Sequence, residues 1–270
     1  MPRFFNRIRK QLAKDNKFFQ YSRYAIGEIL LVVIGILIAL QINNWNEEVN
    51  NLRVERGFYE DILNDFKKDS LKLEGLTIFY KNRIEQAGWL LGKIRSPEGN
   101  VDAEEIGKRI QPLYIGPLSV SYNATYEAAK SSGAFANFRN KDVLKNLNQF
   151  YADIEELNGI LEATMRWLES SLEPMMSKYP ENYMTEESGV YMITSELDDL
   201  KEFYEFVSAI KDKRNLPINL RDILDRPEFE YYLTGELGRS FNALGSIDRR
   251  MMRLDDLKEE IISYINILSE

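Results

Sequence analysis

The sequence predicts an all-α protein with one N-terminal transmembrane helix, followed by an extracytoplasmic bundle of about four long helices. The first observation is an apolar stretch, Tyr24–Trp45, in which Glu28 is the sole polar side chain between Ala25 and Leu40. The second is that long runs after this stretch carry apolar residues at helical spacing. The third is that the 8 prolines and 15 glycines fall mostly between those runs.

The apolar stretch has the length of a membrane span. As a helix, Tyr24–Trp45 reaches roughly 32 Å, which matches a hydrocarbon core of about 30 Å. A buried helix of a soluble protein is one alternative, and a cleaved signal peptide is another. The long basic lead and the absence of an A-x-A pattern in Ile38–Ile42 favour a retained signal anchor.

The residues before the span predict its orientation. Phe4, Ile8 and Leu12 recur every four residues among seven cations and one acid, which favours an interfacial amphipathic helix over a frayed basic tail. Acids outnumber cations just after the span. By the positive-inside rule, residues 1–23 are cytoplasmic, 24–45 cross the membrane, and 46–270 form a periplasmic helical domain.

Several residues of the span are candidate functional positions. Glu28, Gly35 and Ala39 fall near one helix face, and small residues at that spacing let two helices pack closely, so we expect self-association. The alternative is that glycine is simply common in membrane helices. Glu28 is a candidate functional carboxylate or a partner of Arg23. Tyr24 and Trp45 are expected as interfacial anchors.

The next helix is predicted to run from the membrane to about Arg95, where Ser96 and Pro97 stop it. Its buried stripe repeats every seven residues, with Asp69 and Arg83 in the seam, which is more typical of a bundle helix than of a coiled coil. The stripe consists of Leu52, Tyr59, Phe66, Leu73 and Tyr80.

Short helices and breaks are expected between residues 102 and 140. Asp102 with Glu105 resembles a capping box for a helix through Gln111. Ser121 can cap a helix over 122–132 that Gly133 ends. Asn140 then opens a long helix from Lys141 toward Lys178, which Pro174 kinks or ends.

The C-terminal third is predicted as a loop followed by helices. The loop covers 179–194, and a helix follows from Ser195 to about Arg214. A short helical turn is expected at 219–225. Asp225 is expected to cap the last long helix, from Pro227 to Ile267.

Composition excludes several classes of function. The net charge is −8, with +5 in residues 1–42 and therefore −13 in the rest, which argues against nucleic-acid binding. The sequence contains no cysteine and no histidine, which removes thiolate chemistry, the usual general base and the commonest metal ligand. No cofactor or metal motif is found, although a Ser–Lys dyad stays open. Paired acids such as Asp255-Asp256 are interpreted as a solvated face.

Two segments resemble a known family. YAIGEILLVVIGILIALQINNWNEE, at residues 24–48, is similar to the anchor signature of uncharacterised single-pass membrane proteins of Bacteroidota, a domain of unknown function. The segment around Ser131, Ser132 and Gly133, with Phe150 and Tyr151, loosely resembles a later part of the same family. The resemblance implies an inner-membrane location and a periplasmic body, but it implies no activity.

Three classes of function therefore remain. The first is a non-enzymatic interaction or scaffold protein that binds an unknown membrane or periplasmic protein. The second is a ligand-sensing bundle that signals through a membrane partner, and the third is a carboxylate-based hydrolase. For the first class, we expect partner contacts at exposed aromatic residues of segment 112–140, namely Tyr114, Tyr122 and Phe138.

Overall fold

The computed structural model describes residues 18–96, 101–117, 122–179, 205–206, 209–211, 213 and 219–269. Every regular element in these ranges is a helix, which confirms the all-α fold class. The chain divides into two compact units, Met1–Arg56 and Gly57–Glu270. Each unit is described by itself, and the second is called the helical domain. Residues 1–17, where the interfacial helix was expected, lie outside the described ranges.

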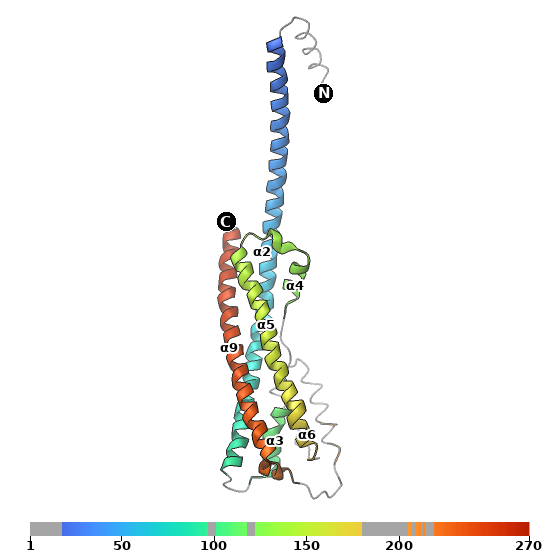
Figure 1. Ribbon diagram of the computed structural model, residues 1–270, viewed down its shortest axis with the longest axis vertical. Helices are drawn as coiled ribbons and strands as arrows, with labels where there is room; N and C mark the ends of the chain where they lie inside the picture. Colours follow the sequence, from blue (N-terminus) through green and yellow to red (C-terminus); the bar gives the residue numbers. More distant parts are fainter. Residues whose placement is uncertain are drawn as a thin grey trace. The chain divides into compact units, whose positions relative to one another are not determined.

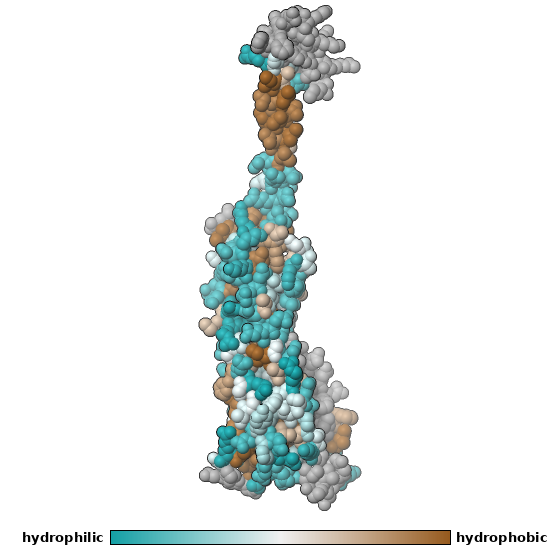
Figure 2. Space-filling view, viewed as in Figure 1, coloured by the Kyte–Doolittle hydropathy of each residue, from teal (hydrophilic) through white to brown (hydrophobic). Residues whose placement is uncertain are grey.

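The first unit consists of the N-terminal part of α2, which runs from Phe18 to Arg95 without a break. Its apolar side chains project outward: those between Ile26 and Ile42 are 43–74% exposed. They belong to a window of mean hydropathy 2.6 in which no residue is buried. Figure 2 shows them as a brown band around the helix. By length and composition this part of α2 is a candidate membrane span.

Three long helices form the helical domain in the described part of the chain, where about four were expected. They are the C-terminal part of α2, α5 (Lys141–Trp167) and α9 (Pro227–Ser269), which run alongside one another in Figure 1. The fourth long helix, expected at 195–214, lies almost wholly outside the described ranges, as does the loop expected at 179–194. The predicted end of α2 at Arg95 is confirmed.

The domain has two apolar clusters. The larger one gathers side chains from α2, α5 and the C-terminal half of α9, including the predicted stripe residues Tyr59, Phe66, Leu73 and Tyr80. The smaller one joins Ala87 and Leu90 of α2 to the start of α9 and to the short helices. Both contain large, fully buried side chains. Between them along α2 lies Arg83, which is also fully buried.

Between α2 and α5 the described residues form four short elements. They are α3 (Ala103–Ile110), the 3-10 turn η1 (Gln111–Tyr114), α4 (Ala124–Ser131) and the 3-10 turn η2 (Ala134–Asn137). The capping box at Asp102 is wrong, because the Asp102 side chain makes no capping hydrogen bond. Ser121, where another cap was expected, lies outside the described residues, and the residue that precedes α4 is Asn123. Gly133 does adopt the expected left-handed conformation, with φ 75°.

Local signals set both ends of α5. The Asn140 side chain accepts hydrogen bonds from the amides of Asp142 and Val143, which confirms the predicted cap. Near Pro174 the helix widens into a π-helical turn, Leu168–Leu172, and continues as α6 (Glu173–Met176). Proline has no amide hydrogen to donate to the preceding turn, so the regular hydrogen-bond pattern is interrupted here.

The last two elements follow the predicted pattern. The 3-10 turn η4 (Leu220–Asp225) begins at Asn219, whose side chain accepts from the amide of Arg221. Helix α9 starts at Pro227, but Arg226 rather than Asp225 occupies the position immediately before it. Proline is well suited to a first helical position, because the missing amide hydrogen has no partner there in any case.

Candidate functional site

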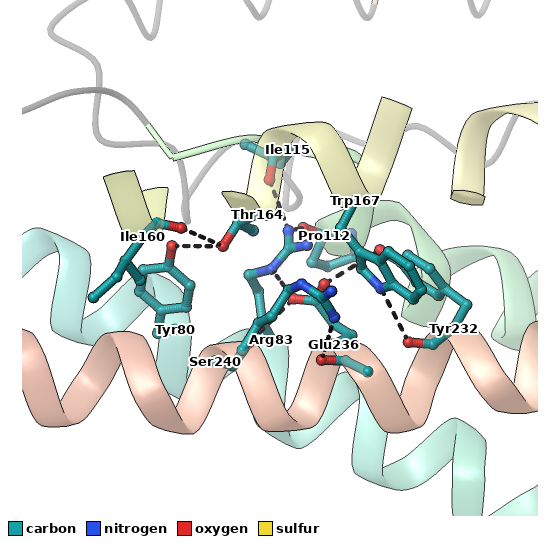
Figure 3. Close-up of polar contacts among 12 residues, drawn as sticks. Tyr80, Arg83, Pro112, Ile115, Ile160, Thr164, Trp167, Tyr232, Glu236 and Ser240 are labelled. Carbon is teal, nitrogen blue, oxygen red and sulfur yellow. Dashed lines mark hydrogen bonds and ion pairs between the residues drawn. The ribbon is translucent and has the colours of Figure 1, made fainter. Parts of the chain in front are cut away.

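A fully buried ion pair joins Arg83 of α2 to Glu236 of α9 in the described part of the helical domain. Nε of Arg83 lies 2.5 Å from Oε1 of Glu236, and both side chains are 0% exposed. The same Oε1 accepts a hydrogen bond from the Ser240 hydroxyl at 3.1 Å. The Tyr232 hydroxyl donates to Oε2 at 3.4 Å. Figure 3 shows these groups converging on the carboxylate.

Arg83 also holds the chain segment that follows α3. Its Nη1 donates to the carbonyl oxygens of Pro112, at 3.1 Å, and Ile115, at 2.7 Å. These carbonyls come from η1 and the residue after it, where the backbone leaves regular helix. One guanidinium therefore joins α2, α9 and this connection (Figure 3).

Helix α5 reaches the same layer through neutral side chains. The hydroxyls of Tyr80 and Thr164 lie 3.1 Å apart. The indole of Trp167 donates to the carbonyl of Tyr232 at 3.4 Å, and the two rings stack with centroids 6.0 Å apart. We call this set the Arg83 layer: Tyr80, Arg83, Thr164, Tyr232, Glu236 and Ser240.

The two tyrosines and the arginine of the Arg83 layer each keep one protonation state near neutral pH. Burial raises the pKa of Tyr80 to about 12. Burial and the adjacent Glu236 carboxylate also raise the pKa of Tyr232. Burial alone would lower the pKa of Arg83, but the charge of Glu236 outweighs it and the pKa is raised. The tyrosines therefore stay neutral donors, and the arginine stays charged.

A second buried ion pair, Asp69 of α2 with Arg250 of α9, is less well satisfied. Oδ2 of Asp69 and Nη2 of Arg250 are 4.0 Å apart, and neither atom has a hydrogen-bond partner in the described residues. Oδ1 of Asp69 accepts from the Tyr122 amide at 3.1 Å. Nη1 of Arg250 donates to the Phe150 carbonyl at 2.8 Å. Burial raises the pKa of Asp69 and lowers that of Arg250 to about 10.

Both ion pairs are suited to joining helices rather than to proton transfer. Each buried carboxylate faces an arginine, and its other contacts are with amides or hydroxyls that do not titrate near neutral pH. A general base would need a pKa near the working pH and access to a substrate proton. We therefore interpret the two pairs as polar layers that position α2 against α9.

An open groove lies between α5 and α9 in the described part of the chain. Its volume is about 410 Å³. Three arginines line it together with three acids, and one arginine, Arg253, pairs with Asp153 across it. Because the charges balance, the groove does not indicate the charge of a ligand. Its lining residues include Asp153, Glu156, Arg249, Arg250, Arg253 and Asp256.

The predicted partner surface is only partly exposed. Tyr114 is 37% exposed, as a contact residue would need to be. Tyr122 is half-buried, with the ammonium of Lys72 4.2 Å from its ring centroid. The prediction for Phe138 is wrong: it is 3% exposed and packs against Phe58, with ring centroids 5.0 Å apart.

The predicted membrane residues lie on the first unit. Trp45 is 66% exposed, and a β-carbon at Gly35 would meet no atom within 4 Å, so both positions are open to a neighbour. Ala39 is exposed, while Tyr24 and Glu28 are half-buried. Self-association through this face stays a prediction.

The pairing in both polar layers was not predicted from the sequence. The heptad pattern placed Asp69 and Arg83 in the buried seam of α2 but indicated no partners for them. A signal was present, because Glu236 and Arg250 also occupy the apolar face of their helix. Charged residues at buried positions of two helices indicate complementary pairs.

Comparison with known proteins finds a similarity over part of the chain. No curated protein and no solved structure matches it. The model of a family of unknown function, DUF6090, matches residues 28–152, from the candidate span into α5. The matched stretch contains Asp69 and Arg83 but not their partners on α9.

Proposed function

We propose that this protein is anchored in the inner membrane by the N-terminal part of α2 and acts as a non-enzymatic interaction or scaffold protein through a periplasmic helical domain. The membrane anchoring is inferred from the apolar surface between Ile26 and Ile42, whose side chains are exposed. No residue in the 18-residue stretch of highest mean hydropathy is buried. A continuous apolar surface of this kind is stable when lipid, rather than water, surrounds it.

The orientation rests on charge. Seven cations precede the span in the sequence, and acids dominate just after it, so the N-terminus stays in the cytoplasm. The compartment rests on the resemblance to Bacteroidota membrane proteins, because these bacteria have an inner membrane and a periplasm. The anchor is retained, since the residues that leave the span do not form a cleavage pattern.

The environments of the carboxylates favour binding over hydrolysis. Glu236 and Asp69 are buried against arginines and hold helices together. Asp255, Asp256 and Glu259 are exposed on α9, as expected of a solvated face. A ligand-sensing bundle is the second candidate, because the α5–α9 groove offers space for a small molecule.

Cysteine labelling tests the orientation, because the native chain has no cysteine. A membrane-impermeant maleimide applied to spheroplasts should label Glu60→Cys, an exposed position, and should spare Lys10→Cys. Lysed cells, in which both positions should react, provide the control. The reverse pattern, or a mature protein that begins near Gln41, would contradict the proposal.

Photocrosslinking tests the interaction role. A photoreactive residue at Tyr114 should capture another protein in living cells, because this side chain is 37% exposed. The same residue at Phe138, which is 3% exposed, is the matched control and should capture none. If Tyr114 and Tyr122 give no adduct while the purified protein binds or converts a small molecule, the interaction role is wrong.

A further inference from the structure

The two polar layers are arranged with matched spacing on two antiparallel helices. Asp69 and Arg83 are separated by 14 residues along α2, and Glu236 and Arg250 are separated by 14 residues along α9. Asp69 faces Arg250, and Arg83 faces Glu236. Fourteen residues of α-helix span about 21 Å and return to nearly the same face. Each helix therefore presents two buried charges, two heptads apart, to the other.

The polarity of the two layers is reversed. In one layer the acid belongs to α2 and the base to α9, whereas in the other the base belongs to α2 and the acid to α9. From N- to C-terminus, each helix therefore carries first an acid and then a base: Asp69 and Arg83 on α2, and Glu236 and Arg250 on α9. Only one antiparallel alignment pairs both sets of opposite charges.

We propose that these two layers form a register key that fixes the longitudinal alignment of α2 against α9. A displacement of α2 by one heptad would bring Arg83 level with Ala243 or Phe229, both fully buried apolar residues. The same displacement would bring Glu236 level with Leu90 or Leu76. Either way, buried charges would lose their partners, which proteins tolerate poorly.

A displacement by two heptads is opposed even more directly. In one direction it brings Arg83 level with Arg250, and in the other it brings Asp69 level with Glu236. Like charges buried together repel. Apolar heptad positions alone do not distinguish these alignments well, because Leu, Ile and Phe side chains recur at them. Buried polar groups that select one helix alignment are a well-attested device in coiled coils.

This inference goes beyond the proposed scaffold function, since it concerns whether α2 can move lengthwise relative to α9. With the key intact, α2 cannot slide along α9 without separating two buried ion pairs. The helical domain then acts as a rigid body, in which α2 and α9 do not slide past each other. The carbonyls of Pro112 and Ile115 extend the key to the connection after α3, because they bind the same Arg83 guanidinium.

Distance measurement between spin labels tests the proposal on the full-length protein in detergent micelles. Leu71→Cys on α2 and Thr234→Cys on α9 provide exposed labelling sites in a chain without native cysteine. In the observed alignment these positions are offset by 14 residues, or about 21 Å along the helices. A slip of one heptad would change this offset by about 10 Å, which double electron–electron resonance resolves.

Two variants remove the key. The apolar variant is Asp69→Leu/Arg83→Met/Glu236→Leu/Arg250→Met, and the neutral polar variant is Asp69→Asn/Arg83→Gln/Glu236→Gln/Arg250→Gln. The unaltered background should give one narrow distance. At least one of the two variants should fold and show a second distance population, as expected for an axial slip of about 10 Å. The matched control, Asp153→Asn/Arg253→Gln, removes a more exposed ion pair between α5 and α9 and should keep the single distance.

Two results would overturn the proposal. A folded variant that keeps the single background distance would show that apolar packing sets the register. Failure of both variants to fold would show that the charges are required for stability itself rather than for alignment.

Discussion

The α-carbon of Gly116 lies so close to the Met165 side chain that a β-carbon at position 116 would come within 1.6 Å of the Met165 sulfur. Gly116 follows the two carbonyls that bind Arg83, and Met165 lies on α5 next to Thr164 of the same layer. The absence of a side chain at Gly116 therefore lets the connection after α3 pack against α5.

Gly116→Ala should destabilise the helical domain, because the Met165 side chain must move out of its place. Overpacking typically lowers the free energy of unfolding by about 1–3 kcal/mol, and because the flexible Met165 side chain can turn aside, the loss here should lie near the lower end of that range. Urea unfolding of the purified protein, followed by circular dichroism, measures the change. The control is Gly238→Ala on α9, where the new β-carbon meets nothing within 4 Å. That exposed helical position should gain stability, by roughly 0.5–1 kcal/mol. Equal effects at the two positions would contradict the argument.

The cap of α5 provides a second prediction. Asn140→Ala removes the oxygen that accepts hydrogen bonds from the amides of Asp142 and Val143, both at 3.1 Å. The free energy of unfolding should fall by about 0.5–2 kcal/mol. Asn123→Ala is the matched control, because Asn123 precedes α4 but makes no capping hydrogen bond through its side chain. Thermal unfolding should separate the two variants, and a larger loss from Asn123→Ala would refute this account.

The contribution of Asp69 to the free energy of unfolding should change with pH in the opposite sense to that of a carboxylate whose pKa is lowered by folding. Its pKa is raised in the folded protein, chiefly by burial, while the Tyr122 amide, Arg250 and Lys72 oppose the shift and Asp65 adds to it. Between the ordinary pKa of 3.8 and the raised one, the folded protein binds more protons than the unfolded chain. The contribution of this group to stability therefore rises as the pH falls through that window.

The test compares Asp69→Asn with the wild type by urea unfolding at pH 7 and at successively lower pH. As the pH falls, the difference in unfolding free energy should change in favour of the wild type, because only the wild type gains from protonation of Asp69. Asp248→Asn, which removes an exposed carboxylate on α9, is the control. A difference that stays constant, or that changes in favour of Asp69→Asn, would exclude this interpretation.

Self-association through the candidate span gives a fourth prediction. Gly35→Ile should weaken it, because a branched side chain on the expected contact face holds two helices apart. Residues 20–48 fused to a membrane two-hybrid reporter provide the measurement. Leu37→Ile, on a different face and 58% exposed in the wild type, should leave the signal unchanged. Equal signals from wild type and Gly35→Ile would show that this face is not an interface.

The sequence predicted those parts of the fold that local signals determine. The end of α2 at Arg95, the cap at Asn140 and the left-handed Gly133 all depend on a few neighbouring residues, and all are confirmed. The caps expected at Asp102 and Ser121 also depended on local signals, but Asp102 precedes α3 without a side-chain capping bond, and α4 begins after Asn123 rather than after Ser121.

Contacts between distant residues were not predictable in the same way. Phe138 was expected at the surface because its segment is interrupted by glycine and short helices. It is buried because Phe58, Tyr59 and Phe135 surround it, and two of these lie on α2. Arg83 and Glu236 are 153 residues apart in the sequence. Their pairing depends on the antiparallel alignment of two helices, which no local pattern specifies.

The π-helical turn that follows α5 bears on how related chains can differ in length. Thr164, Leu168, Leu172 and Met176 are all buried, although a run of four-residue spacings would turn a regular α-helix away from the core. The wider turn over Leu168–Leu172 absorbs one extra residue and brings the later side chains back to the same face. A relative that lacks one residue between 168 and 172 can therefore keep both flanking sets of core positions, whereas a one-residue gap within α5 itself would rotate one set toward solvent.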